Sequence, residues 1–529
     1  MRVTPIVACL CVVATAAYEL RVIHTNDIHA HLDEFNEGGI DCRQVDVDEN
    51  TCYGGIARMR TAIDRVREEA ARVGQETLLF DAGDQFQGTL FFNVYKSAKI
   101  TEFMNAFQYD LMCIGNHEFD ESEEFLFKFF ESLSFPVVSA NIDLNTTKFL
   151  HRIVKPYVIL EKYKLGVIGF ITKETQSISM GARGITFLDP VGPVQQAVDE
   201  LHRQGIRRII AVSHNGFKED QYLAAHTHGI ALIVGGHSHS LLLNEPNDDA
   251  VGRYPTPVVN TLGKTTYVVQ AHRYGDYLGN VLVEWDDNDD VVSVEGDPIR
   301  LDQSIPKHTQ TADDVAGWRL AFDYLTNSEA GKANASFEGD CVPGRSCPMA
   351  ELVADAMLAE RRPAGAQIAL INAGGIRAHL SQGGVTCGDV LNVLPFGNTI
   401  TDITLTGQDI IDIIESNLEG LTLSDPPLPI ITSAHWAGVR YSYRSSAPPY
   451  RRVVFIDVAD VAGSYTRLVP DSKYVVVTDD FIAWGGDNFF VQGRHDVIQL
   501  DLVYDVVVRY IQQQETIFPA MDGRVQAVP

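Results

Sequence analysis

Five short apolar runs in the N-terminal half each end in a polar cluster, and this pattern constrains the fold more than any other feature. Runs bounded by glycine and polar residues are typical of buried strands. Helical patterns lie between them, at 56–73, 122–132 and 193–204. The alternation predicts an α/β domain with functional loops at the strand ends. The runs and their clusters are Leu20–Ile23 with His24–His29, Thr77–Phe80 with Asp81–Asp84, Leu111–Ile114 with Gly115–Glu118, Ile209–Val212 with Ser213–Gly216, and Ile230–Val234 with Gly235–His239.

The clusters are rich in aspartate, histidine and asparagine, which together suit zinc, manganese or iron. Asp27 and His29 are two residues apart, so an extended backbone directs both side chains to one face. A site for two ions about 3.5–4 Å apart needs a shared ligand, and a carboxylate bridges more readily than an imidazole. We therefore expect two divalent cations, zinc first, with manganese or another divalent ion as alternatives. The predicted ligands are Asp27, His29, Asp84, Asn116, His214, His237 and His239.

The motifs also suggest how the ligands divide between the two ions. Asp84, which follows Gly83, is the expected bridge. The remaining ligands fall into two sets: Asp27, His29 and His239 for one ion, and Asn116, His214 and His237 for the other.

Such a pair of ions would generate a hydroxide nucleophile near neutral pH and neutralise charge on a phosphoryl group. His117 directly follows a predicted ligand and is free to act on the substrate, and Asp120 is placed to orient its ring. The expected chemistry is phosphoryl hydrolysis, with His117 and Asp120 as the catalytic pair.

The first residues resemble a secretory signal peptide, although a buried strand is the alternative. Arg2 precedes the apolar stretch Ile6–Val13, and Ala14-Thr15-Ala16 has the pattern of a cleavage site, so residues 1–17 are the predicted signal. Sequons at Asn145 and Asn334 agree with secretion and glycosylation. No later segment is long and apolar enough to span a membrane, and we expect no lipid anchor. We expect an extracellular, soluble protein.

Cysteine spacing and net charge indicate which disulfides and which binding partners to expect. Two local disulfides are expected, Cys42–Cys52 and Cys341–Cys347, whereas Cys113 is expected to be a buried thiol and Cys387 has no evident partner. The net charge of −28 argues against nucleic acid as a partner. The sequence does not indicate an oligomeric state.

The chain divides near residue 306. Residues 18–305 form the first predicted domain, 306–326 a connecting helix and 327–529 a second α/β domain. The connecting pattern runs from Thr311 to about Leu325. Predicted elements of the second domain are the strands Ala366–Ile371 and Tyr474–Thr478 and the helices Met349–Arg361 and Gly407–Ser416.

In their order, the N-terminal motifs resemble those of calcineurin-like metallophosphoesterases, and the whole mature chain resembles the 5′-nucleotidase/apyrase family. The motifs are Ile23–His29, Asp81–Gly88, Gly115–Asp120 and Gly235–His239, and in the second half Asn372–Arg377, Pro395–Thr399 and Gly485–Asp487. The resemblance implies a four-layer α/β/β/α metallophosphoesterase sandwich, joined by a helix to a C-terminal nucleotide-binding domain.

The resemblance also implies where a nucleotide would bind. Phe396 and Phe481 would sandwich the base, Asp487 would accept hydrogen bonds from the ribose, and Asn372 would contact the base edge. Arg377 would hold phosphate oxygens. On sequence alone, the two phenylalanines would be read as core residues. Closure of the two domains about the connector is a further implication.

One loop departs from the family pattern. The family usually has an arginine directly after the first cysteine of the 341–347 region, where this chain has Val342. Arg345 is the candidate replacement for phosphate binding.

The leading hypothesis is phosphate release from AMP, from ADP and ATP, or from both, by attack of metal-bound hydroxide. The alternatives are a UDP-sugar or cyclic-nucleotide hydrolase, and a catalytically weak nucleotide-binding scavenger.

Overall fold

A computed structural model describes residues 18–423, 427–460, 462–490, 498–520 and 522–529. The predicted signal peptide, 1–17, lies outside this range. Within it, none of the helices combines the length and apolar character that crossing a membrane requires.

The N-terminal domain contains two sheets that pack face to face. The first has the order β12-β11-β1-β2-β3-β4, with β13 beside β11, and the second β5-β6-β7-β8-β10-β9. β1 to β4 run parallel, as do β6, β7 and β8. The strands are β1 (Tyr18–Thr25), β2 (Glu76–Asp81), β3 (Leu111–Cys113), β4 (Val137–Val138), β5 (Tyr157–Leu160), β6 (Leu165–Ile171), β7 (Arg208–His214), β8 (Leu232–Val234), β9 (Thr256–Val259), β10 (Thr265–Val269), β11 (Tyr277–Trp285), β12 (Val291–Gly296) and β13 (Ile299–Arg300).

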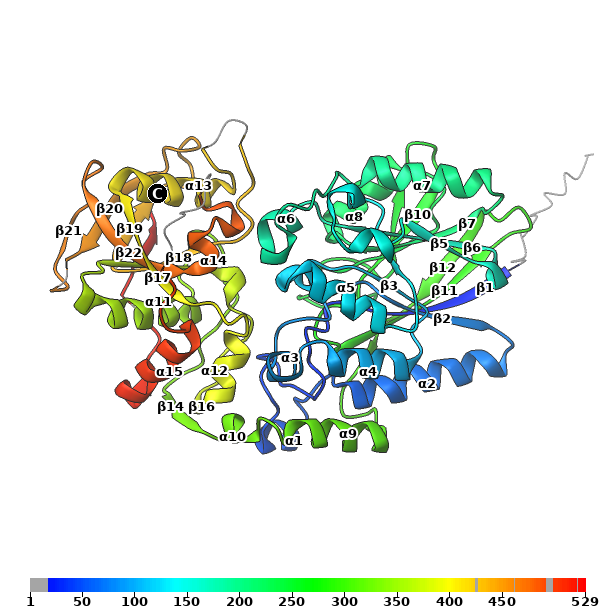
Figure 1. The fold of residues 1–529 in the computed structure, drawn as a ribbon, viewed down its shortest axis with the longest axis horizontal. Helices are drawn as coiled ribbons and strands as arrows, with labels where there is room; N and C mark the ends of the chain where they lie inside the picture. Colours follow the sequence, from blue (N-terminus) through cyan, green and yellow to red (C-terminus); the bar gives the residue numbers. More distant parts are fainter. Residues whose placement is uncertain (1–17, 424–426, 461, 491–497, 521) are drawn as a thin grey trace, which may run out of the picture.

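Helices cover the outer faces of both sheets (Figure 1). All seven residues of β6 are buried, as expected for a strand covered on both sides. α7 presents Val194, Ala197, Val198 and Leu201 at helical spacing to the second sheet. The helices of this domain are α1 (Gln44–Asp48), α2 (Ile56–Arg72), α3 (Leu90–Tyr95), α4 (Ala98–Phe107), α5 (Glu123–Ser132), α6 (Thr175–Ile178), α7 (Val191–Arg203) and α8 (Phe217–His226). The predicted four-layer fold is confirmed.

The connector contains two helices instead of the single one that we expected from Thr311 to Leu325. α9 spans Thr309–Arg319 and α10 spans Asp323–Thr326. Between them, Phe322 turns into the N-terminal core, where its ring meets Phe91 edge-on at a centroid distance of 5.0 Å. Burial of this one aromatic ring explains why the helix breaks.

The C-terminal domain is built around the mixed sheet β17-β22-β15-β18. α11 and α15 pack on one side of this sheet, and α13 packs on the other. Small sheets with the orders β16-β14-β23 and β21-β20-β19-β24 flank it. The strands are β14 (Glu329–Ala333), β15 (Ile368–Asn372), β16 (Gly383–Thr386), β17 (Ile400–Thr406), β18 (Ala434–Ala437), β19 (Val439–Tyr443), β20 (Val453–Ala459), β21 (Tyr465–Arg467), β22 (Lys473–Asp479), β23 (Thr516–Ile517) and β24 (Val525–Ala527). The helices are α11 (Pro348–Arg361), α12 (Cys387–Val393), α13 (Gly407–Glu419), α14 (Asp480–Ala483) and α15 (Val503–Gln514).

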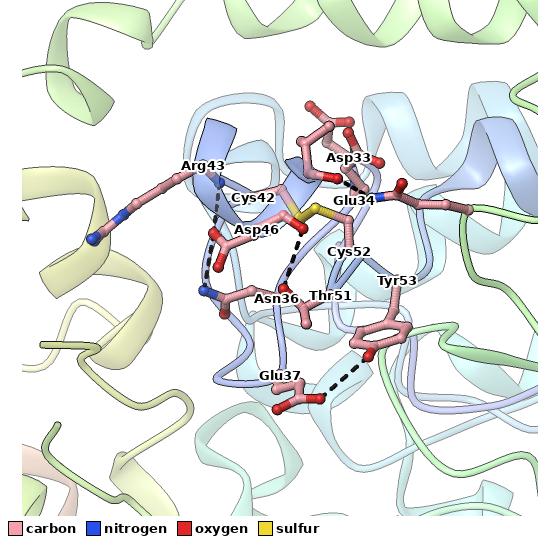
Figure 2. Close-up of a disulfide and its surroundings, with 12 residues drawn as sticks. Asp33, Glu34, Asn36, Glu37, Cys42, Arg43, Asp46, Thr51, Cys52 and Tyr53 are labelled. Carbon is pink, nitrogen blue, oxygen red and sulfur yellow. Dashed lines mark hydrogen bonds between the residues drawn. A yellow bond between two sulfur atoms is a disulfide. The ribbon is translucent and has the colours of Figure 1, made fainter. Parts of the chain in front are cut away.

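Both predicted disulfides are present, and Cys113 and Cys387 are buried free thiols. The Cys42–Cys52 bond closes a loop of the N-terminal domain that reaches the C-terminal domain. Figure 2 shows Arg43 pointing away from this bond, and its guanidinium lies 2.7 Å from Asp389. Ile40, two residues before Cys42, is fully buried in the core of the C-terminal domain. The loop therefore joins the two domains.

Candidate active site

The five polar clusters meet at one place because they follow the carboxyl ends of parallel strands in two packed sheets. β1, β2 and β3 of the first sheet lead to Asp27, Asp84 and Asn116, respectively. β7 of the second sheet ends at His214, and β8 leads to His237. All seven predicted ligands are brought together on the side of the N-terminal domain that faces the C-terminal domain.

Five of the seven predicted ligands adopt left-handed backbone, which is costly for residues other than glycine. Their φ angles are 50° at Asp27, 48° at His29, 58° at Asp84, 76° at His237 and 50° at His239. Such conformations persist where surrounding structure fixes them, and they concentrate at functional sites.

The ligand loops approach one another so closely that glycine is required between them. A Cβ atom on Gly83 would lie 2.5 Å from the backbone nitrogen of Gly115. Glu118 holds the same two loops together, since its buried carboxylate accepts hydrogen bonds from the N–H groups of Asp84, Gln85, Phe86 and Gly115. Sequence reasoning did not assign a role to Glu118.

The side chains form overlapping groups of possible ligand atoms, and the division between two ions stays a prediction. Asp27 Oδ1 lies 3.3 Å from His239 Nε2, which is 3.2 Å from His29 Nε2. Asp84 Oδ2 lies 3.0 Å from His214 Nε2 and 3.7 Å from His29 Nε2. Asp84 thus lies between the two groups, as a bridging carboxylate must.

The donor atoms fit two divalent cations. The carbonyl oxygens of Phe86 and Ala82 lie 3.0 Å from His29 Nδ1 and 2.6 Å from His214 Nδ1, so each Nδ1 is placed to carry the proton and each Nε2 to present a lone pair. Asn116 Oδ1 is buried and has no hydrogen-bond partner among the described residues. A bound cation would satisfy a buried polar atom of this kind.

Burial also keeps two of the histidines neutral. It lowers the pKa of His237 to about 3 and that of His239 to about 4, whereas the charges of Asp84 and Asp27 outweigh burial at His214 and raise its pKa to about 10. Neutral imidazoles are the form that binds metal ions.

The predicted catalytic pair is assembled beside this cluster. Asp120 Oδ2 lies 2.6 Å from His117 Nδ1, and His117 Nε2 lies 4.0 Å from Asp84 Oδ2. Burial alone would lower the pKa of His117, but the negative charges of Asp120 and Asp84 outweigh it and raise that pKa. The raised pKa favours the protonated form of His117, and its Nε2 is the ring nitrogen nearer Asp84.

A cavity of about 530 Å³ lies between the two domains and begins at this pair. Asn116, His117 and His237 line it from the N-terminal domain. The C-terminal domain contributes five of the six predicted nucleotide-binding residues: Asn372, Arg377, Phe396, Phe481 and Asp487.

Contacts inside the cavity join these residues to one another and to the cluster. Asn372 Nδ2 donates to Asp487 Oδ2 at 2.6 Å. The Phe396 ring stacks on His117 at a centroid distance of 5.5 Å, and Arg377 Nη2 lies 3.1 Å from His29 Nε2. The metal-binding and nucleotide-binding candidates therefore form one continuous site.

Arg345 is the predicted site residue that does not join this site. It is exposed and is not part of the cavity lining, because its loop folds onto a different surface. The Gly344 carbonyl accepts a hydrogen bond from Tyr443 on β19, which holds the loop there. Sequence reasoning also missed Lys96 and Glu121, which line the cavity and form an ion pair at 2.7 Å. Neither residue has a motif that could have revealed it.

Comparison with known proteins agrees with this architecture. Residues 20–241 match the family model described as calcineurin-like phosphoesterase, and residues 326–493 match the 5′-nucleotidase C-terminal domain. The 5′-nucleotidase of Homo sapiens is 33% identical over 97% of this chain and 92% of its own. A snake venom 5′-nucleotidase from Naja atra is 31% identical over 96% of this chain and 98% of its own.

A solved structure shows the same two-domain arrangement. The 5′-nucleotidase precursor from Thermus thermophilus superposes with a TM-score of 0.86 at 33% identity, covering 97% of this chain and 99% of that one. The matched domains and the His/Asp clusters identify a metal-dependent phosphoester hydrolase. The chain belongs to the 5′-nucleotidase family.

Proposed function

We propose that the protein is a secreted 5′-nucleotidase that releases phosphate from extracellular nucleoside 5′-phosphates: AMP, ADP and ATP, or a subset of them. The observation that supports this most is the single cavity shared by the two domains. Its lining combines side chains that suit a nucleoside with His117 and with Asn116 and His237 of the proposed cation cluster. A nucleotide spanning the cavity would bring its phosphate to the cluster.

The proposed nucleoside subsite would hold a flat base and a ribose. The proposed role of Phe396 and Phe481 is to bind the two faces of the base. Asp487 would accept hydrogen bonds from the ribose hydroxyls. Asn372 Oδ1 is buried without a hydrogen-bond partner among the described residues, so it is free to bind the base edge.

The proposed phosphate subsite would combine the cations with protein groups. Two divalent ions held by the seven proposed ligands would neutralise phosphoryl charge and lower the pKa of water at the site. Arg377 would bind phosphate oxygens through its guanidinium fork. Asp120 fixes the His117 ring, so His117 Nε2 can donate a proton to the departing oxygen.

A substrate panel tests the proposal. The purified protein, supplied with Zn²⁺ or Mn²⁺, is given AMP, ADP, ATP, a UDP-sugar and a cyclic nucleotide, and released phosphate is measured. We expect phosphate release from at least one 5′-nucleotide. Nucleotide binding without turnover of any compound would instead indicate a scavenger, and turnover of the UDP-sugar or cyclic nucleotide alone would indicate a different hydrolase.

Secretion is a separate part of the proposal. It is supported by the apolar N-terminus, the two disulfides and the exposure of both sequon asparagines, Asn145 and Asn334. Expression in animal cells should yield a product in the medium that begins near residue 18 and loses mass on treatment with a glycosidase. Retention of residues 1–17 in an intracellular product would contradict this.

A further inference from the structure

Tyr274 lies at the junction between the metal-binding candidates and the C-terminal domain, yet no motif marks it. Its side chain is only 4% exposed, and its backbone is left-handed with a φ of 59°. Its N–H group donates to the Asp27 carbonyl at 2.6 Å. The backbone of Tyr274 is therefore tied directly to a proposed ligand loop.

The ring of Tyr274 packs within the N-terminal domain. It stacks on His31 at a centroid distance of 4.0 Å. It also meets the rings of His29 and His239 edge-on, each at 5.9 Å. These contacts leave the ring little freedom to rotate or shift.

The hydroxyl of Tyr274 contacts the C-terminal domain. It donates to the carbonyl oxygen of Arg377 at 2.8 Å. The N–H of Arg377 in turn donates to the Val393 carbonyl at 2.9 Å. The backbone of Arg377 is thus held from both sides while its guanidinium reaches His29.

We propose that Tyr274 is a positioning residue for phosphate recognition. Its ring is fixed against the proposed metal ligands, and its hydroxyl holds the Arg377 backbone so that the guanidinium lies beside the cation cluster. This inference rests on the proposed function, in which Arg377 binds the phosphate group. A small misplacement of a binding group weakens the interactions that it makes with substrate.

The variant Tyr274→Phe isolates this role, because phenylalanine keeps the ring contacts and removes only the hydroxyl. Tyr450→Phe is a matched control. Tyr450 also has left-handed backbone, with a φ of 57°, and its hydroxyl donates to a backbone carbonyl, that of Leu421 at 3.2 Å. It does not line the cavity between the domains.

The first test measures two constants with the metal-loaded enzyme: the inhibition constant of inorganic phosphate and the KM for AMP. In Tyr274→Phe we expect both constants to rise about 3- to 10-fold, the effect of one net hydrogen bond. The kcat, the bound metal per chain and the affinity for adenosine should stay as in the wild type and in Tyr450→Phe. An unchanged phosphate constant, or an equal loss of adenosine affinity, would overturn the proposal.

A double-mutant cycle shows whether the hydroxyl acts through Arg377. In an Arg377→Ala background, Tyr274→Phe should cause no further loss of phosphate affinity. If the two losses add in full, the hydroxyl acts by another route and the inference is wrong.

Hydrogen exchange separates this inference from the proposed function. Amides of residues 376–380 should exchange faster in Tyr274→Phe than in Tyr450→Phe, while those of α11 exchange equally. If the wild type hydrolyses no nucleotide but this difference appears, the positioning role stands and the proposed function fails. Equal exchange in both variants would overturn the positioning role itself.

Discussion

At the scale of single residues, the site depends on side chains held in costly backbone conformations. Asp27, His29, Asp84, His237 and His239 all have positive φ angles between 48° and 76°. The motifs predicted which residues meet, since spacing and residue type carry that information. They did not predict the conformations, because left-handed backbone at Asp or His is imposed by contacts distant in sequence.

The His117–Asp120 pair gives the first prediction. His117→Ala removes the proposed proton donor, so kcat should fall about 10²- to 10⁴-fold while bound metal per chain stays unchanged. His272→Ala is the control. His272 Nδ1 lies 2.6 Å from Asp276 Oδ2, so the two form a similar pair, but His272 does not line the cavity. Similar activity of the two variants would remove His117 from the mechanism.

Asp487 gives a prediction about pH. Burial raises the pKa of its carboxyl to about 6, so the group gains a proton as the pH falls through that value. A protonated carboxyl is a poorer acceptor for ribose hydroxyls, so the KM for AMP should rise below about pH 6. In Asp487→Asn the KM should be high throughout and lack this step. The measurement is the KM for AMP from about pH 5 to about pH 8. If the rise in KM at low pH persists in Asp487→Asn, a group other than Asp487 causes it.

At the scale of elements, strand direction explains why the sequence predicted so much of the site. Parallel strands of one sheet end at the same edge, so the clusters after β1, β2 and β3 converge, as do those after β7 and β8. The packing of the two sheets brings these two edges together. The course of the connector and of the Arg345 loop could not be predicted in this way, because side-chain packing sets it. The connector breaks at Phe322 because that ring is buried, and Arg345 misses the cavity because Tyr443 holds its loop elsewhere.

Glu118 gives a prediction about the loops that follow β2 and β3. Glu118→Gln replaces one acceptor oxygen with an amide that faces N–H donors, so we expect a loss of roughly 2–4 kcal/mol in the free energy of unfolding. Because these loops carry Asp84 and Asn116, Zn²⁺ affinity should fall as well. Urea denaturation and Zn²⁺ titration measure the two effects.

Glu123→Gln is the matched control for this variant. The Glu123 carboxylate likewise accepts backbone hydrogen bonds, three against the four of Glu118. Its donors are Lys148, Phe149 and Leu150, away from the proposed ligands. It should lose stability and keep its Zn²⁺ affinity. Equal Zn²⁺ affinity in both variants would show that Glu118 does not hold the ligand loops in place.

At the scale of the whole molecule, the site exists only where the two domains meet, and the Cys42–Cys52 loop is part of that junction (Figure 2). Ile40→Ala empties a buried position in the C-terminal core, so the free energy of unfolding should fall by about 2–5 kcal/mol. Val45→Ala, at a position inside the Cys42–Cys52 loop that is 54% exposed, should have little effect. Equal stability of both variants by denaturant titration would mean that the burial of Ile40 does not help to hold the domains together.

Domain closure about the connector stays a prediction. The cavity draws its walls from both domains, so any rotation between them would change the distance from Asp487 to His117. A disulfide engineered across the domain boundary should lower kcat if opening is needed for product release. Full activity of the locked enzyme would contradict this.

The central claim is that two divalent cations, held by the seven converging side chains, make this chain a nucleotide phosphohydrolase. The most direct test strips the protein with a chelator and returns Zn²⁺ stepwise, recording bound ions per chain and phosphate release from AMP, ADP and ATP together. The account predicts no turnover without metal and full turnover only when two ions are bound. Full turnover of the stripped protein, or saturation of activity with a single ion, would contradict it.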